Sequence, residues 1–183
     1  INAQPVCQGV QTVFNNQSSI AYGQIVNYYW AFGDNSFALG FNPSHLYSNA
    51  GNFNVIVTAT SDHNCVSNAM QTVVVHPKPN VNFQSTSTCL NQATQFNNQS
   101  NIIAGTIIKY RWDFENDGTI DDSTANPTHI YPTAGIQQSR LMAISNSNCM
   151  SQNTNPVIVH YNPVAKFSAP STCLPASTTF SDL

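Results

Sequence analysis

The segment that decides the fold reads WAFGDN at residues 30–35 and NPSHLY at residues 42–47, and it occurs twice. The second copy reads WDFEND at residues 112–117 and NPTHIY at residues 126–131, at a spacing of about 84 residues. A period shared by aromatic residues, a proline and a histidine indicates tandem copies of one structural unit. A third copy begins near the end of the sequence. Its markers are the series Phe14, Phe96 and Phe180 and the series Cys7, Cys89 and Cys173.

The period divides the sequence into three segments. We expect a first repeat at residues 1–79 whose first strand is mostly missing, a second repeat at residues 80–163, and the truncated start of a third at residues 164–183. Because both ends fall inside repeats, we expect the sequence to be an excerpt of a longer protein. Prolines at the joins, residues 76–79 and 160–163, fix φ and remove amide donors. We therefore expect short, stiff linkers and repeats arranged nearly in line.

Large apolar residues alternate with other residues leading into the WAFGDN segment and its copy. They are Val26, Tyr28, Trp30 and Phe32 in the first repeat and Ile108, Tyr110, Trp112 and Phe114 in the second. A period of two is typical of a strand with one buried face. Turn-forming residues separate such runs, so each repeat has room for about seven short strands, which favours an antiparallel two-sheet sandwich. The predicted fold class is all-β, as tandem sandwiches with Trp30 and Trp112 in their cores.

The composition excludes two classes of partner. Only 7% of the residues are charged, and the net charge is −3. Five Lys and Arg residues cannot line a track of nucleic-acid phosphates, nor form a basic patch for acidic lipids. The sequence has no run of about 20 apolar residues that would span a membrane. We expect neither nucleic acid nor, within this segment, a membrane as partner.

Each repeat has one early and one late cysteine. The economical pairing is Cys7–Cys65 and Cys89–Cys149, and Cys173 then pairs outside the segment. Free buried thiols are the alternative, whereas zinc is disfavoured because no CxxC or His–x3–His spacing accompanies these cysteines. Disulfides at this density predict an oxidising, extracellular location.

The quoted motifs resemble those of the PKD domain, an immunoglobulin-like β-sandwich of extracellular proteins. A Gly-x-aromatic-x-Val strand completes the family pattern in AGNFNVIVTA at residues 50–59, whereas the second copy has Ile136 in place of the aromatic residue. The cysteine pairs and the Asn-rich texture are similar to PKD repeats of giant surface proteins of Bacteroidota. The resemblance implies roles in structural spacing, adhesion or carbohydrate association, often after export by the type IX route.

The histidines of the NPxHxY motif are candidates for ligands or catalytic bases. Catalysis would need a nucleophile or carboxylate that repeats with them, and none does. We therefore predict no enzymatic activity and a structural role for the motif, with local hydrogen bonds. Its residues are His45, Tyr47, His129 and Tyr131.

The second repeat carries an acidic cluster that the first lacks. Its predicted calcium ligands are Asp113, Glu115, Asp117 and Asp121. Alternating carboxylates followed by glycine are similar to the start of a calcium loop, although Thr124 stands where an EF-hand has its final Glu. The alternative is a solvated acidic turn, and no other cofactor is expected.

One short motif predicts a modification. Asp122-Ser123-Thr124 resembles the acceptor at which Bacteroidota attach O-glycans, and this makes Ser123 a candidate glycosylation site.

Three hypotheses follow for the function. The first is a non-enzymatic extracellular stalk or filament segment of a large adhesin-like surface protein. Its partners would be the neighbouring repeats of the same long chain, other fibre subunits or surface glycans. The second is a carbohydrate-binding module that uses exposed aromatic residues such as Tyr22, Tyr29, Phe37 and Phe41. The third is an accessory module of a secreted hydrolase whose catalytic domain lies outside this segment.

Overall fold

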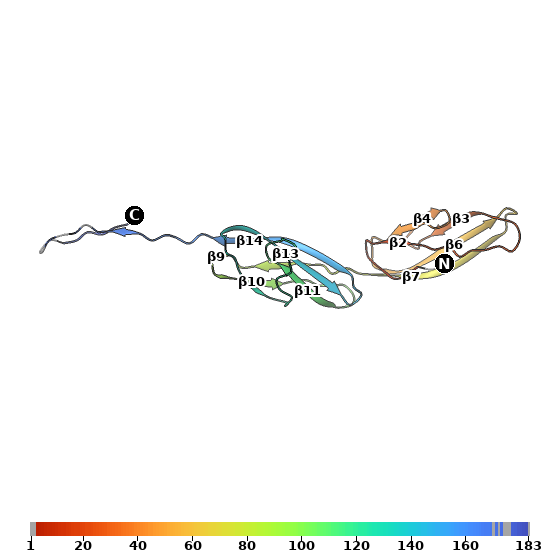
Figure 1. The fold of residues 1–183 in the computed structure, drawn as a ribbon. Helices are drawn as coiled ribbons and strands as arrows, with labels where there is room; N and C mark the ends of the chain where they lie inside the picture. The colour runs from red at the N-terminus through yellow and green to blue at the C-terminus, as the bar shows by residue number, and fades with distance from the viewer. Residues whose placement is uncertain (1–2, 170, 172, 174–176, 183) are drawn as a thin grey trace.

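The protein is an end-to-end array of β-sandwiches. A computed structural model describes residues 3–169, 171, 173 and 177–182, and it shows two sandwiches followed by a short hairpin (Figure 1). The predicted all-β class is confirmed. The described part contains no helix, and hence none long and apolar enough to cross a membrane. Ile1 and Leu183, which the period places inside repeats, lie outside the described residues.

Repeat 1 consists of a five-stranded sheet and a two-stranded sheet. The larger sheet has the order β1-β7-β6-β3-β4, and the smaller one pairs β2 with β5. The strands are β1 (Val6–Cys7), β2 (Gln11–Val13), β3 (Ile25–Ala31), β4 (Phe37–Leu39), β5 (Ser44–Leu46), β6 (Gly51–Ser61) and β7 (Val66–His76). All pairs are antiparallel except β1 with β7, where Cys7 lies opposite His76.

Repeat 2 has the same plan in two sheets, β11-β13-β14-β9 and β12-β10-β8. Its strands are β8 (Phe83–Ser85), β9 (Thr88–Cys89), β10 (Ala93–Asn98), β11 (Ile107–Asp113), β12 (Thr128–Ile130), β13 (Gly135–Ser145) and β14 (Met150–His160). Here β9 runs parallel to β14 and places Cys89 opposite His160. The early cysteine therefore occupies the same place in both repeats.

Each sandwich has its own core, centred on its tryptophan. Trp30 and Trp112 are both 0% exposed, which confirms their predicted burial. The indole N–H of Trp112 donates to the carbonyl of Thr124 at 2.9 Å, and that of Trp30 donates to Gly40 at 3.0 Å. Because each buried indole keeps a hydrogen-bond partner, its apolar area can leave water without an unpaired polar group.

The last described residues form a two-stranded hairpin. The strands β15 (Phe167–Ser168) and β16 (Ser181–Asp182) pair antiparallel, with Phe167 opposite Asp182. Phe83 lies opposite Asn98 in the same way, so this hairpin has the register of β8 and β10. The period seen in the sequence thus continues in the pairing.

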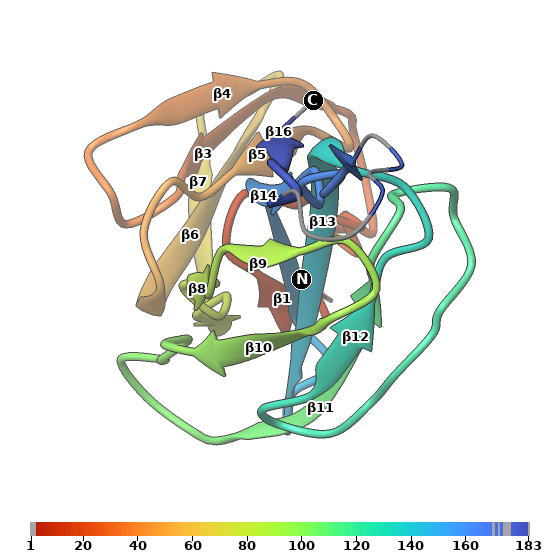
Figure 2. The ribbon, with the colours of Figure 1, turned by 90° about the vertical axis from the view of Figure 1, so that its left-hand side faces the viewer.

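The two sandwiches are joined by a very short linker. Strand β7 ends at His76, and Asn80 is already bridged to Asn101 of repeat 2. The units follow one another along a line in Figure 1, as predicted. In the view along that line they overlap, with β3 and β4 on one side and β10, β11 and β12 on the other (Figure 2). Successive units are therefore rotated about the long axis.

Candidate functional site: the junction between the repeats

A disulfide crosses the junction between the two repeats. It joins Cys7 of repeat 1 to Cys149 of repeat 2, with Cα atoms 5.5 Å apart, which lies within the usual range for disulfides. The predicted pairs Cys7–Cys65 and Cys89–Cys149 are therefore wrong. Among the described residues Cys65, Cys89 and Cys173 are free and exposed.

The strand topology explains why the two cysteines of one repeat cannot pair. Cys65 stands just before β7, whereas Cys7 lies opposite His76 at the other end of that strand. A strand of this length spans roughly 35 Å at about 3.3 Å per residue. A disulfide requires Cα atoms within about 7 Å. An early and a late cysteine come within bonding distance only across a junction. There the late cysteine of one repeat lies beside the early cysteine of the preceding repeat, as Cys149 lies beside Cys7.

Residues of both repeats and of the linker lie around the disulfide. Cys149 is 0% exposed, and its Sγ lies 4.0 Å from the carbonyl oxygen of His76. On the other side, the loop after Cys7 lies against the linker, since a Cβ added to Gly9 would sit 3.5 Å from Lys78 Nζ. Gly9 has φ of +69°, a conformation that favours glycine. The site connects two units covalently.

The motif histidines each face a carboxylate, and His45 Nε2 also lies 3.2 Å from the hydroxyl of Ser36. His45 Nε2 is 2.7 Å from Asp34 Oδ2, and His129 Nε2 is 2.7 Å from Glu115 Oε1. Each imidazole also stacks on the phenylalanine of its repeat, with centroids 4.3 Å apart in both cases. The carboxylate comes from a different sequence position in the two repeats, yet the arrangement is the same. These contacts hold the turn after the tryptophan strand against β5 or β12.

The buried motif tyrosines hold the same turn by hydrogen bonds to its backbone. Tyr47 donates its hydroxyl to the carbonyl of Phe32 at 3.1 Å, and Tyr131 donates to Phe114 at 3.3 Å. Both rings are 1% exposed. Burial raises the pKa of Tyr131 to about 12, although the hydrogen bond with Ser139 lowers it, and burial raises the pKa of Tyr47 as well. The predicted structural role of His45, Tyr47, His129 and Tyr131 agrees with these contacts.

The carboxylate of Asp34 should make repeat 1 sensitive to acid. Burial raises its pKa, but hydrogen bonds from Ser36 and His45 outweigh burial, so the pKa of Asp34 lies below 3.8. A depressed pKa stabilises the fold above pH 4, and this contribution disappears as the pH falls through the folded-state value. Asp34→Asn should lower the free energy of unfolding by about 1 kcal/mol at pH 7.

Urea unfolding from pH 7 to pH 2 checks this prediction. The difference between wild type and Asp34→Asn should be constant down to about pH 5 and shrink below pH 4. Asp62→Asn is the control, because Asp62 pairs with His63 at an exposed turn. A difference that grows toward low pH would have the wrong sign.

The predicted calcium ligands do not converge on one point. Asp113 is 0% exposed, forms an ion pair with Arg140, and accepts the amides of Asp117 and Gly118. The other three carboxylates have separate partners: Glu115 faces His129, Asp117 accepts from Thr119, and Asp121 accepts from Phe114. Among the described residues, no three His, Cys, Asp or Glu side chains are grouped as metal ligands would be.

The acidic cluster instead shapes a turn that is longer than its counterpart in repeat 1. Strand β4 covers the edge of β3 in repeat 1, but only Asp122 bridges Trp112 at the equivalent edge. Hydrogen bonds from Thr124 are the main cause of the lowered pKa of Asp122. Ser123 is exposed beside it, so the glycosylation prediction remains a prediction.

Repeat 1 has an exposed aromatic face that repeat 2 lacks. Tyr29 and Phe37 stack at 5.6 Å between centroids, and they are 40% and 64% exposed. The other apolar members of this aromatic face are Leu39, Ile56 and Met70. In repeat 2 the positions of Tyr29 and Ala31 on the tryptophan strand are taken by Arg111 and Asp113.

A shallow hollow of about 310 Å³ opens over the core of repeat 1, with Val57, Ala59 and Cys65 in its wall. In repeat 2 the counterparts Leu141 and Ala143 belong to the same buried cluster as Phe83 of β8. Among the described residues repeat 1 has no counterpart of β8.

Two stacked immunoglobulin-like units that share a disulfide define this chain as a tandem array of β-sandwich modules. The family described as PKD domain matches residues 1–76 and residues 74–159. The chain belongs to the PKD domain family. PKD domains are structural or binding modules of extracellular or secreted proteins, and they are typically non-catalytic.

Several solved structures are similar to parts of the chain. The PKD1 domain of Epp from Vibrio anguillarum is 25% identical, covers 46% of this chain and 96% of its own, and has a TM-score of 0.42. The PKD1 domain of the Vibrio cholerae metalloprotease PrtV is also 25% identical, covers 45% and 98%, and has a TM-score of 0.41. The fibronectin(III)-like modules of Clostridium thermocellum CbhA are 12% identical, cover 87% and 90%, and have a TM-score of 0.41.

Proposed function

We propose that this chain is a non-enzymatic structural segment of an extracellular stalk or filament. The proposal places it in a large adhesin-like surface protein of the Bacteroidota type, with neighbouring repeats as its first partners. The Cys7–Cys149 disulfide is the observation that carries the proposal. A module that acts alone gains little from a covalent bond to its neighbour, whereas a spacer needs its units held in a fixed line.

The remaining features of the junction support the same function. The linker between β7 and the Asn80 bridge is Pro77-Lys78-Pro79, and its prolines restrict the backbone while lacking amide donors. Bending at this point therefore meets both a stiff linker and a covalent cross-link. Oxidising conditions outside the cell are where such a disulfide persists.

Small-angle X-ray scattering tests the spacer function. The maximum dimension of the protein should equal the sum of the lengths of its units, and it should not change with protein concentration. Passage over immobilised cellulose, chitin and mannan should show no retardation. A compact particle, or retention by one of these polysaccharides, would contradict a pure spacer.

A second candidate function is favoured by the aromatic face of repeat 1. Stacked, exposed rings such as Tyr29 and Phe37 are suited to the apolar faces of sugar rings. This function would make the chain a carbohydrate-binding accessory module of a secreted hydrolase. Retention on a polysaccharide that is lost in Tyr29→Ala/Phe37→Ala would support it. The matched control is Tyr22→Ala, because Tyr22 is 92% exposed and lies outside the aromatic face.

A further inference from the structure

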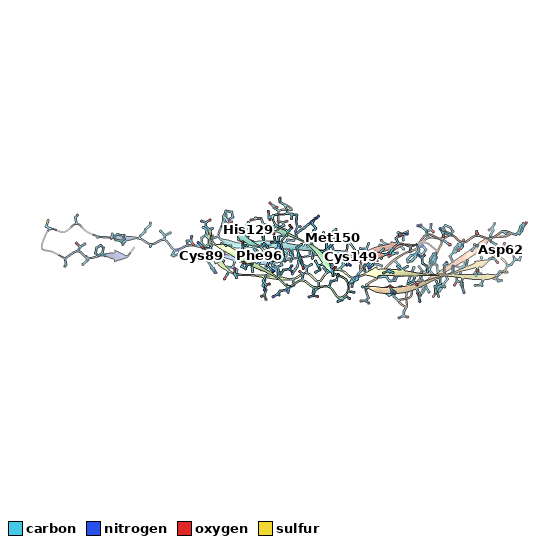
Figure 3. The ribbon with its side chains drawn as sticks, turned by 90° about the horizontal axis from the view of Figure 1, so that it is seen from below. Asp62, Cys89, Phe96, His129, Cys149 and Met150 are labelled. Atoms are coloured by element: carbon cyan, nitrogen blue, oxygen red, sulfur yellow. A yellow bond between two sulfur atoms is a disulfide. The ribbon has the colours of Figure 1, made fainter. Side chains whose placement is uncertain are left out.

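Repeat 2 presents a cysteine at each end of its long strands. Cys149 stands before β14 and is bonded to repeat 1, whereas Cys89 lies opposite His160 at the other end of that strand. Figure 3 shows the two labelled cysteines at opposite ends of the unit, with Cys89 on the side of the β15–β16 hairpin. Cys89 is exposed and has no partner in the part of the chain that the structure describes.

The backbone holds Cys89 as it holds Cys7. Each cysteine lies on a strand parallel to the end of the last long strand, opposite His160 or His76. In both repeats the residue after the cysteine donates its amide to that histidine's carbonyl, at 2.8 Å in repeat 1 and 2.9 Å in repeat 2. The cysteine's own carbonyl accepts an amide three residues later, at 3.0 Å in each case.

The chain leaves repeat 2 as it leaves repeat 1. The same number of residues separates His76 from Phe83 and His160 from Phe167. Phe167 then starts a hairpin in the register of β8 and β10. The second linker also contacts the loop after its cysteine, because Asn162 Nδ2 donates to the carbonyl of Leu90 at 3.3 Å.

The late cysteine has a fixed place whether or not it is bonded. The amides of Cys65 and Cys149 each donate to the hydroxyl of the serine four residues earlier, at 3.1 Å in both repeats. Their hairpins contain an asparagine at φ of +60° and +57° at equivalent positions. Cys65 is unbonded and Cys149 is bonded, so each unit presents this thiol without help from the disulfide.

We propose that Cys89 forms a second junction disulfide with the late cysteine of the unit that begins at Phe167. That partner is the cysteine that corresponds to Cys149 of repeat 2. By the same rule, Cys65 would pair with the early cysteine of a unit that precedes repeat 1. The proposal rests on the observed Cys7–Cys149 bond and on the matched geometry of both ends. It does not depend on the spacer function, because it holds equally for an array that binds glycans.

The chemistry is an ordinary thiol oxidation. Two thiols lose two protons and two electrons, and the Sγ–Sγ bond forms between Cys89 and its partner. A disulfide-containing oxidant accepts the electrons by thiol–disulfide exchange: one thiolate opens it to a mixed disulfide, and the second thiolate displaces the oxidant as a dithiol. The exposed position of Cys89 allows that attack.

A three-unit chain tests the proposal directly. Residues 100–163 are added after Leu183, which completes the third unit with the sequence of repeat 2. The oxidised protein is alkylated before reduction, digested, and mapped by mass spectrometry. We expect Cys7–Cys149 as before and Cys89 linked to the added copy of Cys149, with Cys65 and Cys173 alkylated. In the 183-residue chain, the control, Cys89 should be alkylated. The protein isolated from its source is mapped in the same way and should also show Cys89 linked to a later repeat.

Several results would overturn the proposal. Alkylated Cys89 in the source protein would do so, and so would a Cys89–Cys65 or Cys89–Cys173 bond. Dimers in which Cys89 of one chain is bonded to Cys89 of another would also contradict it, because the proposed bond joins neighbouring units of the same chain. Loss of the Cys7–Cys149 bond from the three-unit chain would remove the template on which the inference is built.

Discussion

Replacing Trp112 by alanine should lower the free energy of unfolding of repeat 2 by about 3–5 kcal/mol. The indole is 0% exposed and packs against Phe83 and Phe96, with ring centroids 5.0 and 5.2 Å away. The substitution removes this buried area, leaves a cavity, and removes the indole N–H that donates to the carbonyl of Thr124. Trp30 remains as a fluorescence probe of repeat 1, so urea unfolding followed by circular dichroism and fluorescence separates the two units.

The matched control for this variant is Ile108→Ala in the same strand. Ile108 is 62% exposed, so its truncation should cost within about 0.5 kcal/mol. A loss below about 1 kcal/mol in Trp112→Ala would show that the core of repeat 2 does not depend on its tryptophan.

The second large effect is expected from Cys7→Ser/Cys149→Ser. This variant opens a covalent loop with a sequence separation of 142, so the summed stability of the two repeats should fall by about 2–5 kcal/mol. Small-angle scattering should also show a broader distribution of shapes, because only the proline-containing linker then holds the units in line. Neither Cys7 nor Cys149 belongs to the core cluster of its repeat, so both units should stay folded.

Cys65→Ser/Cys89→Ser is the control with the same chemical change at unbonded cysteines. Both residues are exposed, and neither stability nor shape should change in the 183-residue chain. Equal effects of the two double variants would mean that the junction disulfide does not hold the units together.

The local pattern of the sequence was sufficient to predict the fold of each unit. Alternation around Trp30 and Trp112 reports burial on one face of a strand, and this depends only on neighbouring residues. The paired motifs, through their resemblance to PKD domains, also indicated the family. The local hydrogen bonding of His45 was predicted from its motif, but its carboxylate partner was not, because Asp34 and Glu115 stand at different sequence positions in the two repeats.

The cysteine pairing was not predictable in this way. Spacing along the chain suggested a bond within each unit, but the parallel pairing of Cys7 with the end of β7 places it a full strand length from Cys65. That pairing joins residues far apart in sequence and leaves no local pattern. The ion pair of Asp113 was not predictable for a similar reason, since its partner Arg140 lies on a strand distant in sequence.

The position of the Cys7–Cys149 bond determines how the chain carries tension. A pull on its two ends enters through the residues before Cys7, crosses the sulfur atoms, and continues along β14 and the second linker. Residues 8–148 lie outside this load path. The extended length of that segment, roughly 480 Å, therefore cannot add to the end-to-end length of the molecule even when both sandwiches unfold. Unfolding of the two sandwiches therefore barely lengthens the molecule under tension.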